Sequence, residues 1–424
     1  MSFSVRTVGR AVRNYAARLR MFSPNARLYL AHAIVAGTAM GVFRLIFNFF
    51  VLARGFDEAL LGGLVTVNSL TSLIVALPMG YTADLLGRKR SLVGSTALMA
   101  ASVVLMVLVP TTGVLYACNI LFGIANSLAA VTMSPFLMEN SGEEERTYLF
   151  SFSSGLQMAA QSVGNWLGGV LPGWVGSAQG VSAVSAQAYG VSLLIVAVGA
   201  AAALLPLLFL RIPVLPKAQR TVFAPITYAQ SHPALLSKLI TPMLVTSVGA
   251  GLIMPFMNVF FRQQYGQSDA TIGALFAWGS LAMGAGLLLA PPLAERIGKI
   301  QTVVVTQALS IPFLILLGFS PWFWLSVAAY LVRVALMNMS GPIYQTFVME
   351  RVDPSARATV ASLVSMSWNF GWAFSPIISG YLQVRTGFGW PFILTIVLYT
   401  ISTALYWAFF WRPRQKKARD GELL

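Results

Sequence analysis

The chain has 424 residues, of which 57% are hydrophobic and only 10% are charged. Soluble globular domains carry about 25% charged residues, so this composition excludes a soluble domain and indicates a polytopic helical membrane protein. One cysteine and two histidines leave no internal disulfide, no cysteine-based metal site and no histidine metal cluster. The formal net charge of +15 raises the question of nucleic-acid binding, which the distribution of the charges answers below.

The N-terminal stretch, residues 1–24, has no continuous apolar core and does not resemble a secretory signal. As a helix it would carry basic residues on one face and apolar residues on the other. The basic face would consist of Arg6, Arg10, Arg13 and Arg20. Two interpretations stay open: an amphipathic helix lying on the membrane surface, and a disordered basic tail.

Twelve apolar stretches follow, and each is long enough to cross a bilayer, which takes about 20 residues. The first six lie near 28–52, 58–83, 91–110, 113–138, 148–172 and 187–210. The second six lie near 237–261, 270–292, 301–320, 322–349, 358–382 and 389–411. The sequence therefore predicts an all-α membrane protein of twelve transmembrane helices.

The longest interior connection lies at the midpoint and predicts a division into two halves. It is rich in Pro, Lys and Arg and reads as a cytoplasmic linker. The predicted order is a basic tail (1–24), an N-terminal six-helix bundle (25–210), the linker (211–236), a C-terminal six-helix bundle (237–411) and a second basic tail (412–424).

Basic residues predict the orientation of these spans. With both termini on one side, 23 of the 28 Lys and Arg residues fall on that side and 3 on the other. The positive-inside rule then places both termini in the cytoplasm of a multi-pass protein of the cell membrane. The net charge is explained by this topology and by attraction to an anionic inner leaflet, so no nucleic-acid partner is expected.

A charged stretch, residues 80–90, separates the second and third spans and recurs in weaker form later in the chain. Asp84 and Glu295 are 211 positions apart, as are Gly87 and Gly298. The same offset relates Met138-Glu139 to Met349-Glu350 and Arg146 to Arg357. Two related six-helix halves are a signature of transporters.

The pattern Gly80-x-x-x-Asp84-x-x-Gly87-Arg88-Lys89-Arg90 resembles the signature loop between the second and third helices of the major facilitator superfamily. The resemblance covers the whole chain, because the twelve spans, the linker and the second loop agree with it. It implies two pseudo-symmetric six-helix bundles around a central cavity, working by alternating access.

Two patterns of the proton-coupled drug exporters of this family are only partly present. Their fourth helix carries an arginine four residues before a glycine, where this chain has Asn119 before Gly123. Their fifth helix carries a proline where this chain has Gly169. None of the 13 acidic residues falls at mid-membrane, so His32 is the remaining candidate for a coupling proton.

The charged loops are expected to close the cytoplasmic side of the cavity through ion pairs at the helix ends. Asp84 and Arg88 have Glu139 and Arg146 as plausible partners. The predicted gate residues are Gly80, Asp84, Gly87, Arg88, Glu139 and Arg146 in the first half, with Glu295, Gly298, Glu350 and Arg357 in the second. The alternative is that these residues only end helices and attract anionic lipid.

Two arginines lie within predicted spans, Arg44 in the first and Arg333 in the tenth. A buried arginine costs about 2.5–3.5 kcal/mol on insertion scales, so each needs a compensating environment. In the family fold these helices line the cavity, where the arginines could bind a carboxylate or phosphate. The alternative is that they bond to helix carbonyls and brace the bundle. The full set of predicted substrate-binding residues is Arg44, Asn48, Asn119, Asn126, Asn258, Arg333 and Tyr344.

The sequence predicts a secondary transporter of a small organic solute, anionic or amphipathic. A proton-coupled exporter of drugs or metabolites is the alternative, and a non-transporting receptor or scaffold is disfavoured because no loop is long enough for a signalling domain. No enzymatic constellation, cofactor or metal site is predicted. The expected partners are the solute, the lipid bilayer and, in the alternative, a proton, and the expected state is a monomer.

Overall fold

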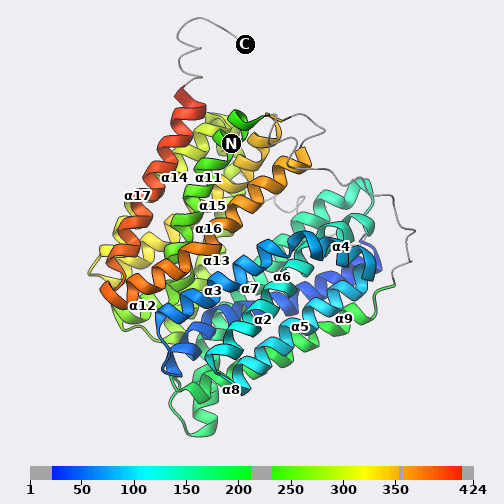
Figure 1. Ribbon diagram of the computed structural model, residues 1–424, viewed down its shortest axis with the longest axis vertical. Coiled ribbons are helices and arrows are strands. Elements are labelled where there is room, and N and C mark those ends of the chain that lie inside the picture. The colour runs from blue at the N-terminus through cyan, green and yellow to red at the C-terminus, as the bar shows by residue number, and fades with distance from the viewer. Residues whose placement is uncertain (1–21, 212–231, 353–356, 413–424) are drawn as a thin grey trace, which may run out of the picture.

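Helices form almost all of the described chain (Figure 1). The computed structural model describes residues 22–211, 232–352 and 357–412, and no strand occurs in these ranges. The N-terminal half contains α2 (Pro24–Ala53), α3 (Glu58–Ile74), α4 (Ala76–Leu86), α5 (Arg88–Leu108), α6 (Thr112–Glu139), α7 (Glu143–Gln179), α8 (Ala186–Ala202) and α9 (Leu204–Leu208). The C-terminal half contains α11 (Pro233–Ile253), a 3₁₀ turn (Met254–Phe256), α12 (Met257–Tyr265), α13 (Asp269–Ile297), α14 (Lys299–Phe319), α15 (Phe323–Met349), α16 (Arg357–Thr386), α17 (Gly389–Tyr406) and a π-helical segment (Trp407–Trp411).

Prolines explain why three of the predicted spans are broken helices. A proline cannot donate to the carbonyl four residues earlier. Accordingly α3 ends four residues before Pro78, α8 ends four residues before Pro206, and the 3₁₀ turn after α11 contains Pro255. Across these breaks the described helices follow the twelve predicted stretches.

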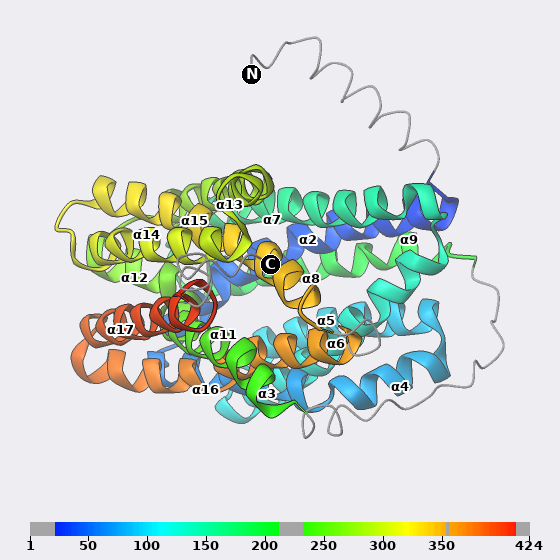
Figure 2. The same cartoon turned by 90° about the horizontal axis from the view of Figure 1, so that it is seen from above.

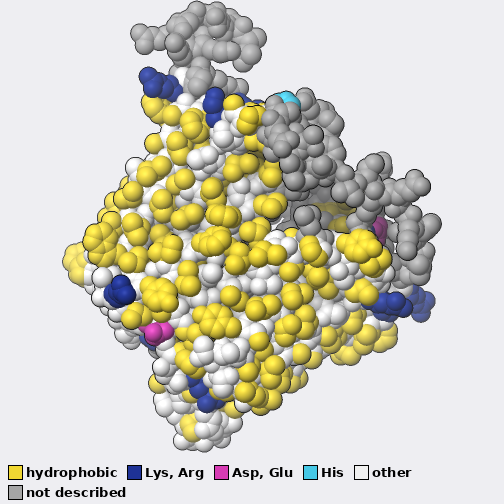
Figure 3. Space-filling model, viewed as in Figure 1, with side chains coloured by type: hydrophobic (Ala, Val, Ile, Leu, Met, Phe, Trp, Pro, Cys, Tyr) yellow, Lys and Arg dark blue, Asp and Glu magenta, His cyan; other side chains and the backbone are white. Residues whose placement is uncertain are grey.

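Nine of the described helical stretches are long and apolar enough to cross a membrane. The others contain α3, α7 and α16, which pack against the opposite half of the protein. The predicted linker lies mostly outside the described residues, and α11 begins within it at Pro233. The predicted N-terminal and C-terminal tails also lie almost wholly outside the described residues. On the face shown in Figure 3, hydrophobic side chains predominate and Lys and Arg lie near the edges.

The two halves pack through two helix pairs, α3 with α16 and α7 with α13. Figure 2 shows these pairs on opposite sides of the molecule. We call the end with the turns at residues 54–57 and 266–268 the closed end, and the end with the turns at Gly87 and Gly298 the open end. The hydrogen bonds that join the two halves in the described ranges all lie toward the closed end. At the open end the bundles diverge, so that α4 and α9 lie far from the end of α17 (Figure 1).

Glycines permit backbone contact between the halves at the closed end. A Cβ on Gly62 of α3 would collide with the carbonyl oxygen of Pro376 in α16. A Cβ on Gly273 of α13 would lie 2.6 Å from the carbonyl oxygen of Asn165 in α7. Gly62 and Gly273 are 211 positions apart, and so are Asn165 and Pro376. The two contacts are therefore equivalent under the sequence repeat, because the glycine and the carbonyl group of one each correspond to those of the other.

A second pair of glycine contacts obeys the same offset. A Cβ on Gly169 of α7 would lie 2.6 Å from the carbonyl oxygen of Asp269, and one on Gly380 of α16 would collide with the carbonyl oxygen of Glu58. Gly169 precedes Gly380 by 211 positions, and Glu58 precedes Asp269 by the same number. Four glycines thus form a two-fold seam, defined here as Gly62, Gly169, Gly273 and Gly380.

Two asparagines exchange hydrogen bonds across the same end. The Nδ2 of Asn48 donates to the carbonyl of Pro255 at 2.8 Å and to Oδ1 of Asn258 at 3.0 Å. In return, Nδ2 of Asn258 donates to the carbonyl of Leu45 at 2.7 Å. Both asparagines are at least 93% buried. Because water cannot reach them, losing these hydrogen bonds would leave buried polar groups without a partner and would lower the stability of the protein.

A charged cluster completes the closed end. Arg262 of α12 forms an ion pair with Asp269, at the start of α13. Tyr189 of α8 joins them from the other half, because its hydroxyl accepts from Arg262 at 2.7 Å and donates to Asp269 at 2.5 Å. The Arg262 guanidinium also lies 3.4 Å from the centre of the Phe49 ring. One half therefore contributes the ion pair and the other the aromatic side chains that cover it.

We expect Gly62→Ala to separate the halves at the closed end, since its methyl group has no space at the seam. Gly94→Ala in α5 is the control, because a Cβ there meets nothing within 4 Å and alanine favours a helix. Spin labels at Gln187 and Gln264, with Cys118 replaced by serine, report the distance between the halves. Longer distances are expected for Gly62→Ala alone, and an unchanged distribution would contradict the seam.

Candidate functional site

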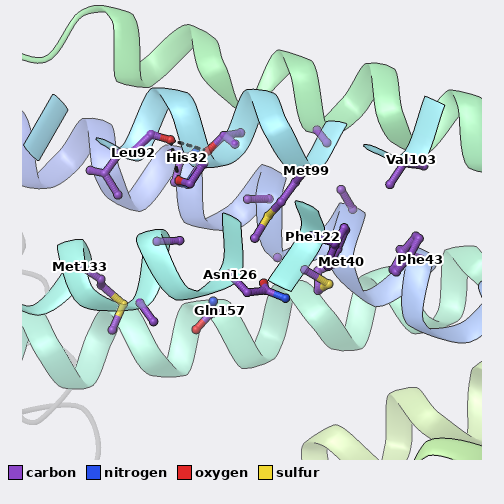
Figure 4. A pocket seen from close by; sticks show the side chains of 18 of the residues that line it. His32, Met40, Phe43, Leu92, Met99, Val103, Phe122, Asn126, Met133 and Gln157 are labelled. Atoms are coloured by element: carbon purple, nitrogen blue, oxygen red, sulfur yellow. Dashed lines mark hydrogen bonds between the residues drawn. The ribbon is translucent and has the colours of Figure 1, made fainter. Parts of the chain in front are cut away.

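A cavity of about 350 Å³ lies inside the N-terminal half. Residues of α2, α5, α6, α7 and α8 line it, and every lining residue belongs to the N-terminal half (Figure 4). The sequence repeat makes the frame of the two halves symmetric. This cavity nevertheless lies in one half.

The wall of this pocket is mainly apolar. Met40 of α2, Met99 of α5 and Met133 of α6 line it. Phe43 and Phe122 also line it and stack on each other, with ring centres 5.0 Å apart and an interplanar angle of 17°. Methionine and aromatic side chains accept ring-containing and irregular apolar groups, so the wall favours a solute with an apolar body.

Two amide side chains supply free hydrogen-bonding groups to the pocket. Asn126 of α6 and Gln157 of α7 line it and have no hydrogen bond to other described residues. In contrast, Ser95 and Thr96 line the pocket but donate to the carbonyl of Leu92, at 3.0 and 2.8 Å. The two amides therefore offer both donors and acceptors to a polar substituent.

Arg44 lies beside the pocket. His32, Ala36 and Met40 line the pocket at intervals of four residues, and Arg44 continues this stripe one helical turn further. Its side chain is exposed although the residue lies deep among the helices. No hydrogen bond or ion pair of Arg44 occurs among the described residues, so its guanidinium has five donors available.

Arg333 has a different environment. Its side chain is 2% exposed, and it donates to the hydroxyl of Tyr399 at 3.2 Å. The guanidinium also contacts the sulfur of Met254 at 3.7 Å and lies 5.4 Å from the centre of the Tyr399 ring. Arg333 therefore packs among α15, α17 and the 3₁₀ turn after α11, whereas Arg44 is exposed beside the N-terminal pocket. That both arginines face a central cavity stays a prediction. A binding role for Arg333 stays a prediction.

The other predicted binding residues do not gather at one point. Asn126 lines the pocket, whereas Asn48 and Asn258 join the halves at the closed end. Asn119 is 6% exposed and donates within α6 to the carbonyl of Leu115 at 2.9 Å. Tyr344 is 4% exposed and donates to the carbonyl of Leu239 at 2.5 Å. Their burial follows from packing that helical spacing alone does not reveal.

Two ion pairs at the open end repeat with the offset of the sequence. Arg88 pairs with Glu139 at 3.0 Å, and Lys299 pairs with Glu350. Both pairs are separated by 51 positions, and the first maps onto the second when 211 is added to each number. The side chains of the first pair are 15% and 26% exposed, against 37% and 53% for the second. Each pair joins two helices of the same half.

The remaining gate residues have the following places. Gly80 lies within α4, while Gly87 and Gly298 have φ angles of +79° and +97° and end α4 and α13. This conformation favours glycine. Glu295 is exposed. Asp84, Arg146 and Arg357 lie in α4, α7 and α16, and their side chains are outside the described part of the chain.

Sequence reasoning missed Gln157, the methionine wall and the Tyr189–Arg262–Asp269 cluster. The cluster had one detectable signal, since Arg262 and Asp269 flank a turn at Gly266, whose φ angle is +59°. Tyr189 is distant in sequence and had none. The methionines looked like ordinary core residues.

Comparison with known proteins identifies one family and several relatives. The sequence model described as "Major Facilitator Superfamily" matches residues 29–250 and 239–423. The tetracycline resistance protein of class G from Vibrio anguillarum is 22% identical over 80% of this chain and 85% of its own length. A protein named as a niacin/nicotinamide transporter, NiaP of Bacillus subtilis (strain 168), is 30% identical, but the match spans 36% of this chain and only 38% of that protein.

Solved structures show the same fold. The nucleoside transporter NupG superposes with a TM-score of 0.71 at 16% identity, covering 91% of this chain and 98% of that one. A bacterial homologue of the human lysosomal transporter Spinster, in an inward-facing and occupied conformation, superposes with a TM-score of 0.73 at 14% identity, covering 91% and 97%.

We expect Asn258→Ala to lower stability and Asn126→Ala to leave it nearly unchanged. Asn258 loses two buried bonds between the halves, which is a cost of about 1–3 kcal/mol, while Asn126 has no described hydrogen bond to lose. Thermal unfolding of the purified variants in detergent measures both. Equal midpoints for the two variants would contradict the stabilising role of the bonds that Asn258 makes between the halves.

Proposed function

The chain belongs to the major facilitator superfamily, and on that premise we propose that it is a secondary transporter of a small organic solute, anionic or amphipathic. The solute binds in the N-terminal pocket and crosses the membrane by alternating access. The observation that carries the proposal is the stripe of α2 on which three pocket residues, His32, Ala36 and Met40, lead to Arg44. Arg44 is an exposed cation with no partner among the described residues.

The lining of the pocket supports an amphipathic solute. Met40, Met99 and Phe122 would cover its apolar body, and the amides of Asn126 and Gln157 would bond a polar substituent. Arg44 would bind an anionic group by charge-assisted hydrogen bonds, which are shorter and stronger than neutral ones. An uncharged polar solute would use the amides and gain little from Arg44.

The arrangement of the halves supports one conformation of the transport cycle. The seam seals the closed end, and the bundles diverge at the open end. On the positive-inside bias of 23 to 3, the open end would face the cytoplasm and this conformation would be inward-facing. Transport would then require the seam to part and the open end to close by rocking of the halves.

The second candidate function is proton-coupled export of drugs or metabolites. The methionine-rich and aromatic wall of the pocket favours it, because such walls accept varied apolar compounds. The resemblance to a tetracycline resistance protein supports the same candidate. Asn119 and Gly169, at positions where such exporters have arginine and proline, weigh against it.

The names of the relatives suggest a matched pair of probes, nicotinate and nicotinamide, which share a ring and differ in charge. In proteoliposomes we expect Arg44→Gln to weaken counterflow of nicotinate about tenfold or more, since a charge-assisted bond contributes about 1.5–3 kcal/mol. Counterflow of nicotinamide should change little. Arg54→Gln, at the end of the same helix, is the control and should affect neither probe.

Tetracycline and uridine complete the set of probes for this experiment. If none of the four compounds shows counterflow, the class of solute that we propose for the pocket is wrong. If nicotinate is transported equally by the parent and by Arg44→Gln, the proposed role of Arg44 is wrong.

We further expect Glu139→Gln to impair transport more than Glu350→Gln. The Arg88–Glu139 pair is less exposed than the Lys299–Glu350 pair, and water weakens exposed pairs. Initial uptake rates, normalised to the amount of protein in the vesicles, compare the two variants. Equal rates, or a larger defect in Glu350→Gln, would show that the difference in exposure between the two pairs does not decide their effect on transport.

A further inference from the structure

His32 is the pocket residue that the proposed function leaves without a role. Its Nδ1 lies 2.9 Å from the carbonyl oxygen of Ala203. A carbonyl oxygen only accepts hydrogen bonds, so Nδ1 must carry the proton. The other ring nitrogen, Nε2, is then the basic one, and it has no hydrogen-bond partner among the described residues.

The position of the imidazole is fixed from two sides. Ala203 lies at the junction of α8 and α9, where Pro206 cannot donate to the carbonyl of Ala202 and the helix is interrupted. On its own helix, the ring of Tyr29 lies 5.8 Å from the ring of His32. The bond to Ala203 therefore holds His32 in one tautomer. Nε2 then remains available to bind a proton or a solute in the pocket.

No other group facing the pocket changes its charge near neutral pH. Helix α2 contributes His32 and Tyr29, while α5, α6, α7 and α8 contribute only aliphatic, aromatic, methionine, hydroxyl and amide side chains. A tyrosine ordinarily titrates at about pH 10 and an imidazole at about 6.5. Arg44, three turns further on the same stripe of α2, stays charged throughout. The charge of the pocket at physiological pH is therefore set by His32.

We propose that Nε2 of His32 binds the proton that accompanies an anionic solute into the pocket. This inference rests on the proposed function and names its coupling ion and the residue that carries it. A hydronium ion at the open end gives up the proton, so that one O–H bond breaks, one N–H bond forms at Nε2 and a water molecule is left behind. The resulting imidazolium and Arg44 then place a cation at each end of the stripe, which attracts an anion.

Linkage makes the coupling reciprocal, because a proton that strengthens anion binding is itself bound more tightly when the anion is present. His32 is protonated below the pKa of its imidazole and neutral above it. Anion affinity is therefore highest at low pH and falls as the pH rises. An uncharged solute has no such dependence.

The test measures binding of nicotinate and nicotinamide to the purified protein at about pH 5.5 and about pH 8, on either side of an ordinary imidazole pKa. Nicotinate stays an anion over this range. We expect its Kd to rise at least about fivefold from the lower to the higher pH, with nicotinamide unaffected. His32→Gln, whose amide can still donate to Ala203, should bind nicotinate independently of pH, and His232→Gln should behave as the parent.

A second measurement does not depend on how the His32 variant folds. The chain has two histidines, so His232→Gln leaves one imidazole for nitrogen NMR. We expect Nδ1 to keep its proton and Nε2 to titrate between about pH 5 and 8, with a higher midpoint when nicotinate is present.

The proposal is overturned if Nε2 does not titrate in this range, if nicotinate leaves its midpoint unchanged, or if His32→Gln keeps the pH dependence of the parent. If neither probe binds, the proposed function fails for these solutes. The titration of Nε2 then still decides whether His32 is a proton site.

Discussion

Backbone contact between the two halves at the closed end is the constraint on which the rest of the structure depends. Glycines at four related positions let α3 approach α16 and α7 approach α13 so closely that no side chain fits between them. Contact of this kind is rigid, because packed interiors do not deform continuously. The halves can therefore part or meet as bodies, and the seam sets which end of the molecule is sealed.

The symmetry of the seam does not extend to the pocket. The glycine contacts and the open-end ion pairs repeat with one offset, yet the cavity lies wholly in the N-terminal half. In the C-terminal half, Arg333 is hydrogen-bonded to Tyr399 and packed against Met254. The pocket proposed for the solute thus lies in one half, while Arg333 is buried in the other.

Much of the fold follows from the sequence because its signals are local. Apolar length predicts the spans, glycines with positive φ end helices, and the offset between Glu139 and Glu350 anticipates two equivalent ion pairs. The site was harder to predict, since the neighbours of a side chain depend on how helices rotate against each other. Arg44 and Asn48 are both predicted to bind the substrate, but Asn48 is hydrogen-bonded to Asn258 while Arg44 stays exposed.

The central claim is that binding needs only the N-terminal pocket, whereas transport needs the seam to part. Cysteines at Ser162 and Ala277, whose side-chain oxygen and backbone carbonyl lie 2.9 Å apart across the seam, can lock the closed end when oxidised in a Cys118→Ser background. We predict that the locked protein binds nicotinate with unchanged affinity, shows no counterflow, and regains counterflow after reduction. Counterflow through the locked protein, or loss of binding on locking, would contradict the account.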